Sequence, residues 1–337
     1  MDMTSTSDNS HAYAELTPER MLDALSSIGL MGDGRMLALS SYENRVVRLH
    51  LDSPPEGVSD VVVVKFYRPD RWSEAAILEE HAFSLALAQA EVPAVAPIAV
   101  NSQTLHHFDG FAFSVSPWFG GRRPNLDDFE TLEWVGRLMA RVHLVGSEAT
   151  FVERPHLDPQ TFGYDCRDLL LAGQHLPLEV ERSWLAAFDE AMQGVQAAWG
   201  THHHASLRLH GDCHPGNILW TPDQGPHFVD LDDARMGPAI QDLWMLLSGD
   251  RGQCTRQLSA VIDGYEQMRD FDRRELALIE PLRTLRLIHY SAWLASRQDD
   301  PAFTHNFPWF GTLAYWQEQV ATLHEQIHAM QQPHLVV

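Results

Sequence analysis

The chain has 337 residues, of which 45% are hydrophobic and 21% are charged, and its formal net charge is −22. This composition is typical of a folded protein and excludes an intrinsically disordered one, and the length favours two lobes over one. The negative charge argues against nucleic acid or an anionic membrane as a partner, because a surface that binds either would be basic. We expect a monomer that binds neither.

The sequence also bears on the compartment in which the protein works. No apolar run approaches the roughly 20 residues that cross a bilayer, and the polar start MDMTSTSDNS lacks the layout of a signal peptide. The three cysteines lie far apart, which fits a reducing compartment. We therefore expect a cytoplasmic protein. The run His202-His203-His204 lacks a second group of ligands at metal spacing, so we expect a solvated loop there.

The first third of the chain is predicted to form a small antiparallel sheet. A helix precedes it over residues 17–29, because Thr17 is a typical N-cap, Pro18 fits the first helical position and Gly29 follows the end. The strands are expected at residues 35–39, 45–51, 60–67, 95–100 and 111–117, the first three as an antiparallel meander.

A second helix is expected from residue 73 to about residue 91, where Leu78, Ala82 and Leu85 recur at helical spacing. The later segment PWFGGRRP is rich in turn-forming residues, and we interpret it as a linker. After it the pattern becomes helical, except for one compact island of apolar runs and turns. The helices are expected at residues 127–146, 180–199 and 238 to about 330, and the island at residues 206–233.

The island carries three polar residues in an arrangement that suits phosphoryl transfer. Asp212 lies in a loop between two apolar runs, Asn217 begins the next strand, and Asp230 follows the strand that the turn TPDQGP folds back. Such a hairpin places Asn217 and Asp230 side by side at one end. A carboxylate and an amide oxygen suit Mg²⁺, and a nearby free carboxylate can accept a proton from a hydroxyl nucleophile.

Lys65 is the only lysine of the chain, whereas the other basic residues are all arginine. It lies in the apolar run VVVVKFY, where an ammonium group is costly unless it is paired. A lysine in such a strand, upstream of the island, completes the set of groups that phosphoryl transfer requires. The alternative is an edge-strand lysine whose ammonium group reaches solvent.

The residues beside the key acids are open to more than one interpretation. Asp232 is a possible ligand of a second Mg²⁺, but Asp232 and Asp233 also fit solvated or helix-capping acids, which we favour. Cys213 is expected to be a plain loop residue, because no constellation for acyl transfer surrounds it.

Two segments of the island resemble motifs of a known group of enzymes. HGDCHPGN (210–217) resembles the catalytic loop HGDxxxxN of the aminoglycoside phosphotransferase and choline kinase group, and FVDLDD (228–233) resembles its metal motif. The resemblance implies an α+β, bilobal protein-kinase-like fold, with a small antiparallel-sheet N-lobe and a larger, mostly helical C-lobe. The implied parts are a disordered tail at 1–12, a nucleotide-binding lobe at 13–117, a hinge linker at 118–121 and a helical catalytic and substrate lobe at 122–337.

A closer resemblance covers nearly the whole chain. The segments SYENRV, VVKFYRPDRW, ILEEH, RLHGDCHPGNILW, FVDLDDARMGPAIQDLWMLL and NFPWF, in this order, are similar to the bacterial stress response kinase A family. This implies a cytoplasmic enzyme that uses ATP and Mg²⁺ to phosphorylate serine or threonine of proteins in a stress response. A kinase for a small hydroxyl compound (an aminoglycoside, choline or homoserine) and an inactive nucleotide-binding scaffold are the alternatives.

The resemblance also implies a role for each matched residue. Asp212 and Asp230 are expected to be catalytic, with Asp212 as the proton acceptor, and Asn217 and Asp230 are expected to hold Mg²⁺. The helix acid that meets the lysine is open between Glu79 and Glu80, and family-like spacing favours Glu80. The remaining roles are contacts of Lys65 with the α- and β-phosphates, of Ser41 with ATP and of Val63 with the adenine, and support of the catalytic loop by His210 and Asp242.

Overall fold

The computed structural model describes residue 13 and residues 15–201 and 204–337, so the expected tail and two histidines of the 202–204 run lie outside the described residues. The chain divides into two compact units. Within the described residues, the first unit comprises the chain up to Asn125, with Phe151–Arg154 and Asp212–Ala234, and the second comprises Leu126–Thr150, Pro155–Gly211 and Arg235–Val337. The lobe boundaries that the resemblance implies remain a prediction.

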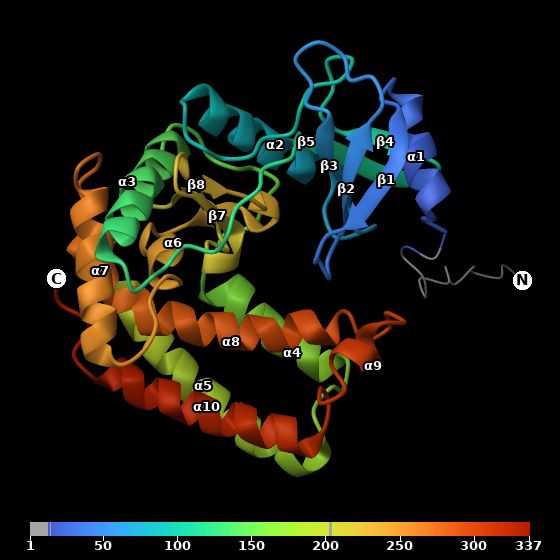
Figure 1. Ribbon diagram of the computed structural model, residues 1–337. Coiled ribbons are helices and arrows are strands. Elements are labelled where there is room, and N and C mark those ends of the chain that lie inside the picture. The colour runs from blue at the N-terminus through green and yellow to red at the C-terminus, as the bar shows by residue number, and fades with distance from the viewer. Residues whose placement is uncertain (1–12, 14, 202–203) are drawn as a thin grey trace, which may run out of the picture. The chain divides into compact units, whose positions relative to one another are not determined.

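The first unit is built on a five-stranded antiparallel sheet with the order β1-β2-β3-β5-β4 (Figure 1). The central strand is β3 (Val61–Phe66), and Lys65 lies opposite Val46 of one neighbour and Ser114 of the other. The meander of the first three strands is therefore confirmed. The other strands are β1 (Gly32–Ala38), β2 (Arg45–Leu51), β4 (His106–Phe108) and β5 (Phe111–Pro117).

The strand expected at residues 95–100 is wrong, and β4 forms the edge of the sheet instead. In that segment the Val95 amide donates to Phe228 at 2.9 Å and the Ile98 amide donates to Val115 at 2.8 Å, so its hydrogen bonds go to two different neighbours. The hairpin between β4 and β5 turns at Asp109 and Gly110, with φ angles of 49° and 85°. An Asp-Gly pair with two positive φ angles is typical of a two-residue hairpin.

Helix α1 (Pro18–Ser27) covers one face of this sheet. It begins as expected, because the side chain of Thr17 accepts a hydrogen bond from the Arg20 amide and Pro18 follows. Its buried residues share a core with alternate residues of β3, among them Val62 and Val64. Since side chains alternate along a strand, Lys65 and Val63 lie on the opposite face of the sheet.

Helix α2 (Glu74–Gln89) forms where it was expected, but the leucines whose spacing indicated it do not face the core. Leu78 and Leu85 are 46% and 40% exposed, whereas Ile77 and Phe83 are buried. The helix is apolar around most of its circumference, so the spacing of the leucines does not single out one face.

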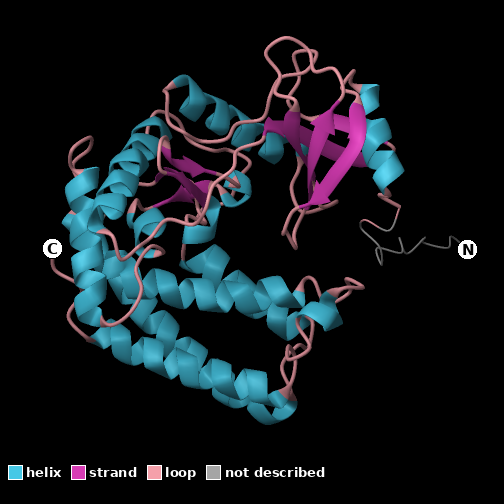
Figure 2. Ribbon diagram, in the orientation of Figure 1, coloured by secondary structure: helices cyan, strands magenta, loops and turns pink. Residues whose placement is uncertain are grey.

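The second unit is mostly helical (Figure 2). Helix α3 (Phe129–Gly146) crosses α7 (Arg251–Tyr265) closely, because a Cβ added to Gly136 would lie 2.0 Å from the Val261 carbonyl oxygen. The ring centroids of Trp184 and Trp316 lie 5.9 Å apart between α5 (Leu178–Thr201) and α10 (Leu313–Gln331). The remaining elements are η1 (Gln160–Tyr164), α4 (Asp165–Ala172), β6 (Leu207–Leu209), β9 (Arg235–Gly237), α6 (Ile240–Trp244), η4 (Arg273–Leu278), α8 (Ile279–Ala295) and α9 (Phe303–Asn306).

The structure agrees with the expected helices at 127–146 and 180–199, which correspond to α3 and α5. The helix α4 was not expected. Across the part of the chain that the structure describes, no helix has both the length and the apolar character that crossing a membrane takes.

Candidate active site

The predicted hairpin forms from β7 (Ile218–Thr221) and β8 (Gly225–Phe228) in the first unit. Ile218 lies opposite Phe228, and the Val229 amide donates to the Asn217 carbonyl oxygen at 3.0 Å. Asn217 and Asp230 therefore lie at the same end of the hairpin, as expected. Asp230 has φ 60° and ψ 65°, a left-handed backbone that is uncommon outside glycine and that aspartate tolerates better than most residues. Such a costly conformation is often found at functional sites.

Asp212 lies in the loop that leads into this hairpin. Its side chain is 21% exposed, and its carbonyl oxygen accepts a hydrogen bond from Asn217 Nδ2 at 3.0 Å. His214 Nε2 lies 3.5 Å from Asp212 Oδ2, while His214 Nδ1 accepts a hydrogen bond from the Gly216 amide. A neutral His214 therefore carries its proton on Nε2, the nitrogen that faces the Asp212 carboxylate.

The backbone that precedes Asp212 belongs to the second unit and is held by Asp242 of α6. The His210 amide donates to Asp242 Oδ2 and the Gly211 amide to Asp242 Oδ1, each at 2.9 Å. His143, which was not predicted, lies 3.1 Å from Asp242 Oδ2 through Nε2, and burial lowers the pKa of its ring. Because Asp212 follows Gly211 directly, this buried carboxylate fixes the chain direction at the start of the loop.

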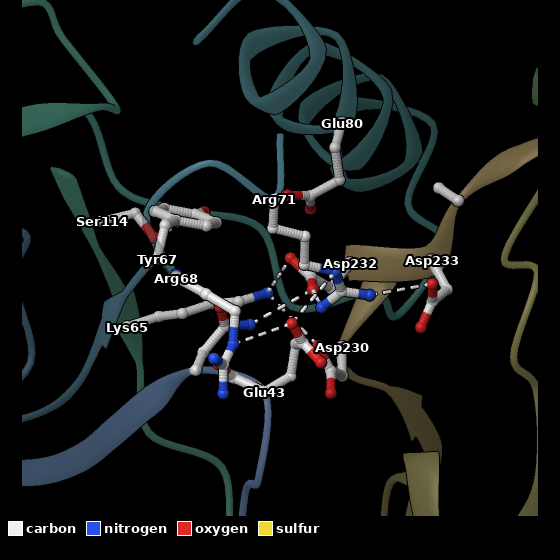
Figure 3. Close-up of polar contacts among 12 residues, drawn as sticks. Glu43, Lys65, Tyr67, Arg68, Arg71, Glu80, Ser114, Asp230, Asp232 and Asp233 are labelled. Carbon is white, nitrogen blue, oxygen red and sulfur yellow. Dashed lines mark hydrogen bonds and ion pairs between the residues drawn. The ribbon is translucent and has the colours of Figure 1, made fainter. Parts of the chain in front are cut away.

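Lys65 points into a group of acids in the first unit (Figure 3). Its Nζ lies 3.2 Å from Asp230 Oδ1 and 3.0 Å from Asp232 Oδ1. Burial by itself would lower the pKa of the ammonium group, but the carboxylates of Asp232 and Asp230 outweigh it and raise the pKa well above its usual value. Lys65 is therefore charged at neutral pH, and its side chain on the central strand is only 16% exposed, so the interpretation as an edge-strand lysine directed at solvent does not hold.

The two glutamates of α2 differ in what they contact. Glu79 accepts hydrogen bonds from the amides of Val152, Glu153 and Arg154 at 2.7, 2.9 and 3.1 Å. Glu80 is buried and accepts a hydrogen bond from Ser84 Oγ at 3.0 Å. Glu79 is thus committed to the backbone of another segment. Glu80 is the helix acid that adds to the negative potential at Lys65, although the ammonium group itself pairs with Asp230 and Asp232.

The interpretation of Asp232 as a solvated acid is wrong. Its side chain is 4% exposed and is paired with Lys65 and with Arg71 Nη1, while Asn44 Nδ2 donates to its Oδ2 at 3.2 Å. Burial by itself would raise the pKa of Asp232, but Lys65 and Arg71 more than offset it and hold the pKa below its usual value. Arg71 and Asn44 belong to segments far upstream, so local spacing gave no indication of them.

Arg71 connects Asp232 to two further acids. Its Nη2 lies 3.0 Å from Asp233 Oδ1, and its Nε lies 3.5 Å from Glu43 Oε1. Glu43 also pairs with Arg68 at 3.1 Å. We call this set the ion-pair cluster. Its members are Glu43, Lys65, Arg68, Arg71, Asp230, Asp232 and Asp233.

Two residues expected to contact ATP lie near the ion-pair cluster: Ser41 is two residues before Glu43, and Val63 is on the same strand as Lys65. Ser41 Oγ accepts a hydrogen bond from the Asn44 amide at 3.3 Å, so it lies in the turn that Asn44 ties to Asp232. Val63 is half-buried on the same face of β3 as Lys65. Cys213 is fully buried beside Asp212, which fits a plain loop residue.

A cavity of about 610 Å³ lies in the second unit, lined by α5, the start of α8 and the C-terminal residues 329–335. None of the predicted site residues lines it. The reacting groups are therefore to be sought at the hairpin and the ion-pair cluster.

The fold and these motifs define the class of protein: the chain belongs to the phosphotransferase enzyme family, whose model matches residues 36–279. Serine/threonine protein kinase RdoA of Salmonella typhimurium and stress response kinase A of Escherichia coli strain K12 are each 44% identical to it over 328 residues. The alignment covers 97% of this chain and 98% of each relative.

Solved structures of kinases share this fold. Amicoumacin kinase hAmiN has a TM-score of 0.69 and 17% identity, with 93% of this chain and 94% of that chain covered. The microcompartment-associated aminopropanol kinase also has a TM-score of 0.69 and 17% identity, with 92% and 97% covered. The predicted α+β, protein-kinase-like fold class is confirmed.

Proposed function

We propose that the protein is an ATP- and Mg²⁺-dependent cytoplasmic kinase that transfers the γ-phosphoryl group of ATP to serine or threonine hydroxyls of proteins in a stress response. The observation that carries the proposal is the pairing of Lys65 with Asp230 at the end of the hairpin that Asp212 and Asn217 lead into. These are the groups that phosphoryl transfer needs. The protein acceptor and the stress role are supported by the names of the 44%-identical relatives.

In this mechanism Asp212 accepts the proton of the attacking hydroxyl, and the hydroxyl oxygen then bonds to the γ-phosphorus as the bond to the β-phosphate bridging oxygen breaks. Asn217 Nδ2 and the Asp242 carboxylate hold the backbone on either side of Asp212. Lys65 binds α- and β-phosphate oxygens, Ser41 contacts ATP from the β1–β2 turn, and Val63 contacts the adenine.

The side chains of Asn217 and Asp230 fit a magnesium ion. Asn217 donates through Nδ2 to Asp212, which leaves its Oδ1 as an acceptor, and the carboxylate of Asp230 is 49% exposed. Hard oxygen donors of this kind suit Mg²⁺, which keeps several waters and shares phosphate oxygens. When bound there, Mg²⁺ would neutralise charge on the phosphates. A carboxylate that is half exposed can turn toward such an ion at little cost.

The second candidate is a kinase for a small, cationic hydroxyl compound. It is supported by the net charge of −22 and by the titles of the solved structures, which include kinases for amicoumacin and aminopropanol. At 17% identity those structures share the fold and do not decide the acceptor.

The experiment is to incubate the purified protein with γ-labelled ATP, a generic protein substrate and, separately, a panel of small alcohols that includes an aminoglycoside, choline and homoserine. We expect label on serine or threonine of protein, and we expect Asp212→Ala to abolish it. Label found exclusively on a small molecule would overturn the protein-kinase proposal. Tight ATP binding without turnover would instead indicate an inactive scaffold.

A further inference from the structure

Lys65 has two carboxylate partners, and they differ sharply in their surroundings. The side chain of Asp230 is 49% exposed, whereas that of Asp232 is 4% exposed. Asp230 is also the acid that we propose for Mg²⁺. If Asp230 turns to the metal, Lys65 keeps only the partner that cannot move. Figure 3 shows Asp232 between the ends of Lys65 and Arg71.

Asp232 is held in place from its side chain and from its backbone. Arg71 and Asn44 contact its Oδ2, which leaves Oδ1 directed at the Lys65 ammonium group. Arg154 Nη1 donates to the carbonyl oxygens of Asp232 and Ala234 at 2.9 and 2.8 Å. Arg154 is itself buried, and its Nε donates to the Ala76 carbonyl oxygen of α2 at 2.9 Å.

Arg71 is equally constrained, because each of its three guanidinium nitrogens meets a carboxylate. Nη1 pairs with Asp232, Nη2 with Asp233 and Nε with Glu43. A planar guanidinium fork fixed at three points sets both the position and the orientation of the carboxylate beside it. A lysine at this position would be a single point charge and would lose that control.

Glu80 occupies the place from which a helix acid would be expected to hold the lysine. Its Oε1 accepts from Ser84 on the same helix, and its Oε2 lies 3.8 Å from His81 Nε2. Of the acids that raise the pKa of Lys65, Asp232 contributes most, followed by Asp230, and Glu80 contributes less. Lys65 donates a hydrogen bond to Asp230 Oδ1 at 3.2 Å, while its ion pair with the buried Asp232 Oδ1 is shorter, at 3.0 Å. Asp232 is therefore the partner that is both close and fixed.

We propose that Asp232, fixed by Arg71 and Asn44, is the positioning residue that holds the Lys65 ammonium group for the phosphates, in place of the glutamate of α2. Arg71 and Asn44 position Asp232 in turn. The proposal rests on the proposed function in so far as Lys65 binds ATP. Asn44 also connects Asp232 to the turn that contains Ser41, the residue proposed to contact ATP. The backbone amide of Asn44 donates to Ser41 Oγ, and Asn44 Oδ1 accepts from the Arg68 backbone amide at 3.1 Å.

The test uses the fact that Lys65 is the only lysine. The protein, prepared with ¹³C-labelled lysine and without lysines from a tag, gives one lysine side-chain signal whose chemical shift reports the surroundings of the Lys65 ammonium group. This shift is compared at neutral pH for the wild type, Asp232→Asn, Glu80→Gln and Asp70→Asn. Asp70→Asn is the matched control, because it removes the same charge as Asp232→Asn from an exposed residue that lies one position before Arg71.

We expect Asp232→Asn to move this signal, Glu80→Gln to move it less, and Asp70→Asn to leave it unchanged. We also expect Asp232→Asn to lower kcat/KM for ATP by about tenfold or more, mainly through KM, because the ammonium group is displaced from the phosphates. A larger effect of Glu80→Gln than of Asp232→Asn on the signal or on kcat/KM would overturn the proposal. If Asp232→Asn does not fold, a fall of about tenfold in kcat/KM for ATP in Glu80→Gln overturns it in the same way.

Failure of the proposed function would look different. If the wild type transfers no phosphoryl group from ATP to any acceptor, the function fails, and the Lys65 signal still decides which acid holds the lysine. If the wild type is active and Asp232→Asn changes neither the Lys65 signal nor kcat/KM, the function stands and the positioning role falls.

Discussion

Glu275 is a buried acid whose titration should make the stability of the second unit depend on pH. It lies in η4, is 3% exposed, and its Oε2 accepts a hydrogen bond from the Ile240 amide at 2.9 Å, at the start of α6. Burial raises the pKa of Glu275 to about 7, the charge of Asp272 adds to the rise, and the hydrogen bond from Ile240 and the charge of Arg269 oppose it. The titration of Glu275 concerns the candidate active site because Glu275 contacts the start of α6, the helix that carries Asp242.

The expected sign follows from the direction of the shift. The folded state holds the Glu275 proton more tightly than the unfolded state, so the contribution of Glu275 to stability is complete below pH 4.5 and is lost as the pH rises to about 7. A shift of about 2.5 pKa units corresponds to about 3 kcal/mol. Glutamine has nearly the shape of the neutral acid and no charge, so Glu275→Gln should remove this loss.

We therefore expect Glu275→Gln to be more stable than the wild type at about pH 8, by up to about 3 kcal/mol, and the difference to disappear toward about pH 5. The assay is urea unfolding followed by circular dichroism across that range. Glu266→Gln is the matched control, because the pKa of this more exposed glutamate is lowered by its hydrogen bond with Arg273. A Glu275→Gln variant that is less stable than the wild type at pH 8 would refute the reasoning.

Three further predictions concern the cluster and the helix packing. Lys65→Arg keeps the charge but should lose most turnover in the label-transfer assay, because a wide planar fork does not fit between Asp232 and phosphate oxygens; turnover at the wild-type level would remove Lys65 from the mechanism. Asp230→Asn should lose turnover with an unchanged melting temperature, since asparagine also tolerates the left-handed backbone; a large drop in melting temperature would contradict this. Gly136→Ala should destabilise by about 1–3 kcal/mol in urea unfolding, because its Cβ meets a backbone oxygen of α7, whereas the control Gly200→Ala, with open space, should be neutral or slightly stabilising.

Much of the first unit could be predicted because its signals are local. Alternation along β3 places Val62 and Val64 in the core and Lys65 on the other face. The start of α1 is predicted by adjacent residues, the N-cap Thr17 and Pro18 at the first helical position. The spacing of Asp212, Asn217 and the turn before Asp230 was also enough to predict the hairpin. The Asp-Gly turn before β5 was present in the sequence and was missed in favour of the apolar run at 95–100.

The partners of Asp232 could not be predicted, because they depend on contacts between distant segments. Arg71 lies 161 residues before Asp232 and Asn44 lies 188 residues before it. Similarly, helical spacing alone did not decide between Glu79 and Glu80. They are told apart only by Phe151–Arg154, which return to the first unit and present three amides to Glu79. Periodicity reports which face of an element is buried, but not which remote charge it meets.

The charges of the ion-pair cluster link the choice of lysine to the need for a metal. The cluster contains three cations, Lys65, Arg68 and Arg71, and four carboxylates, so its own charge is −1. The phosphates of a nucleotide would add further negative charge to a site that already has an excess of it. Arg71 cannot compensate, because its three nitrogens are committed to acids, and Lys65 retains Asp232. Of the two acids that pair with Lys65, Asp230 is the more exposed. A divalent cation bound at Asp230 would neutralise both its carboxylate and the phosphates.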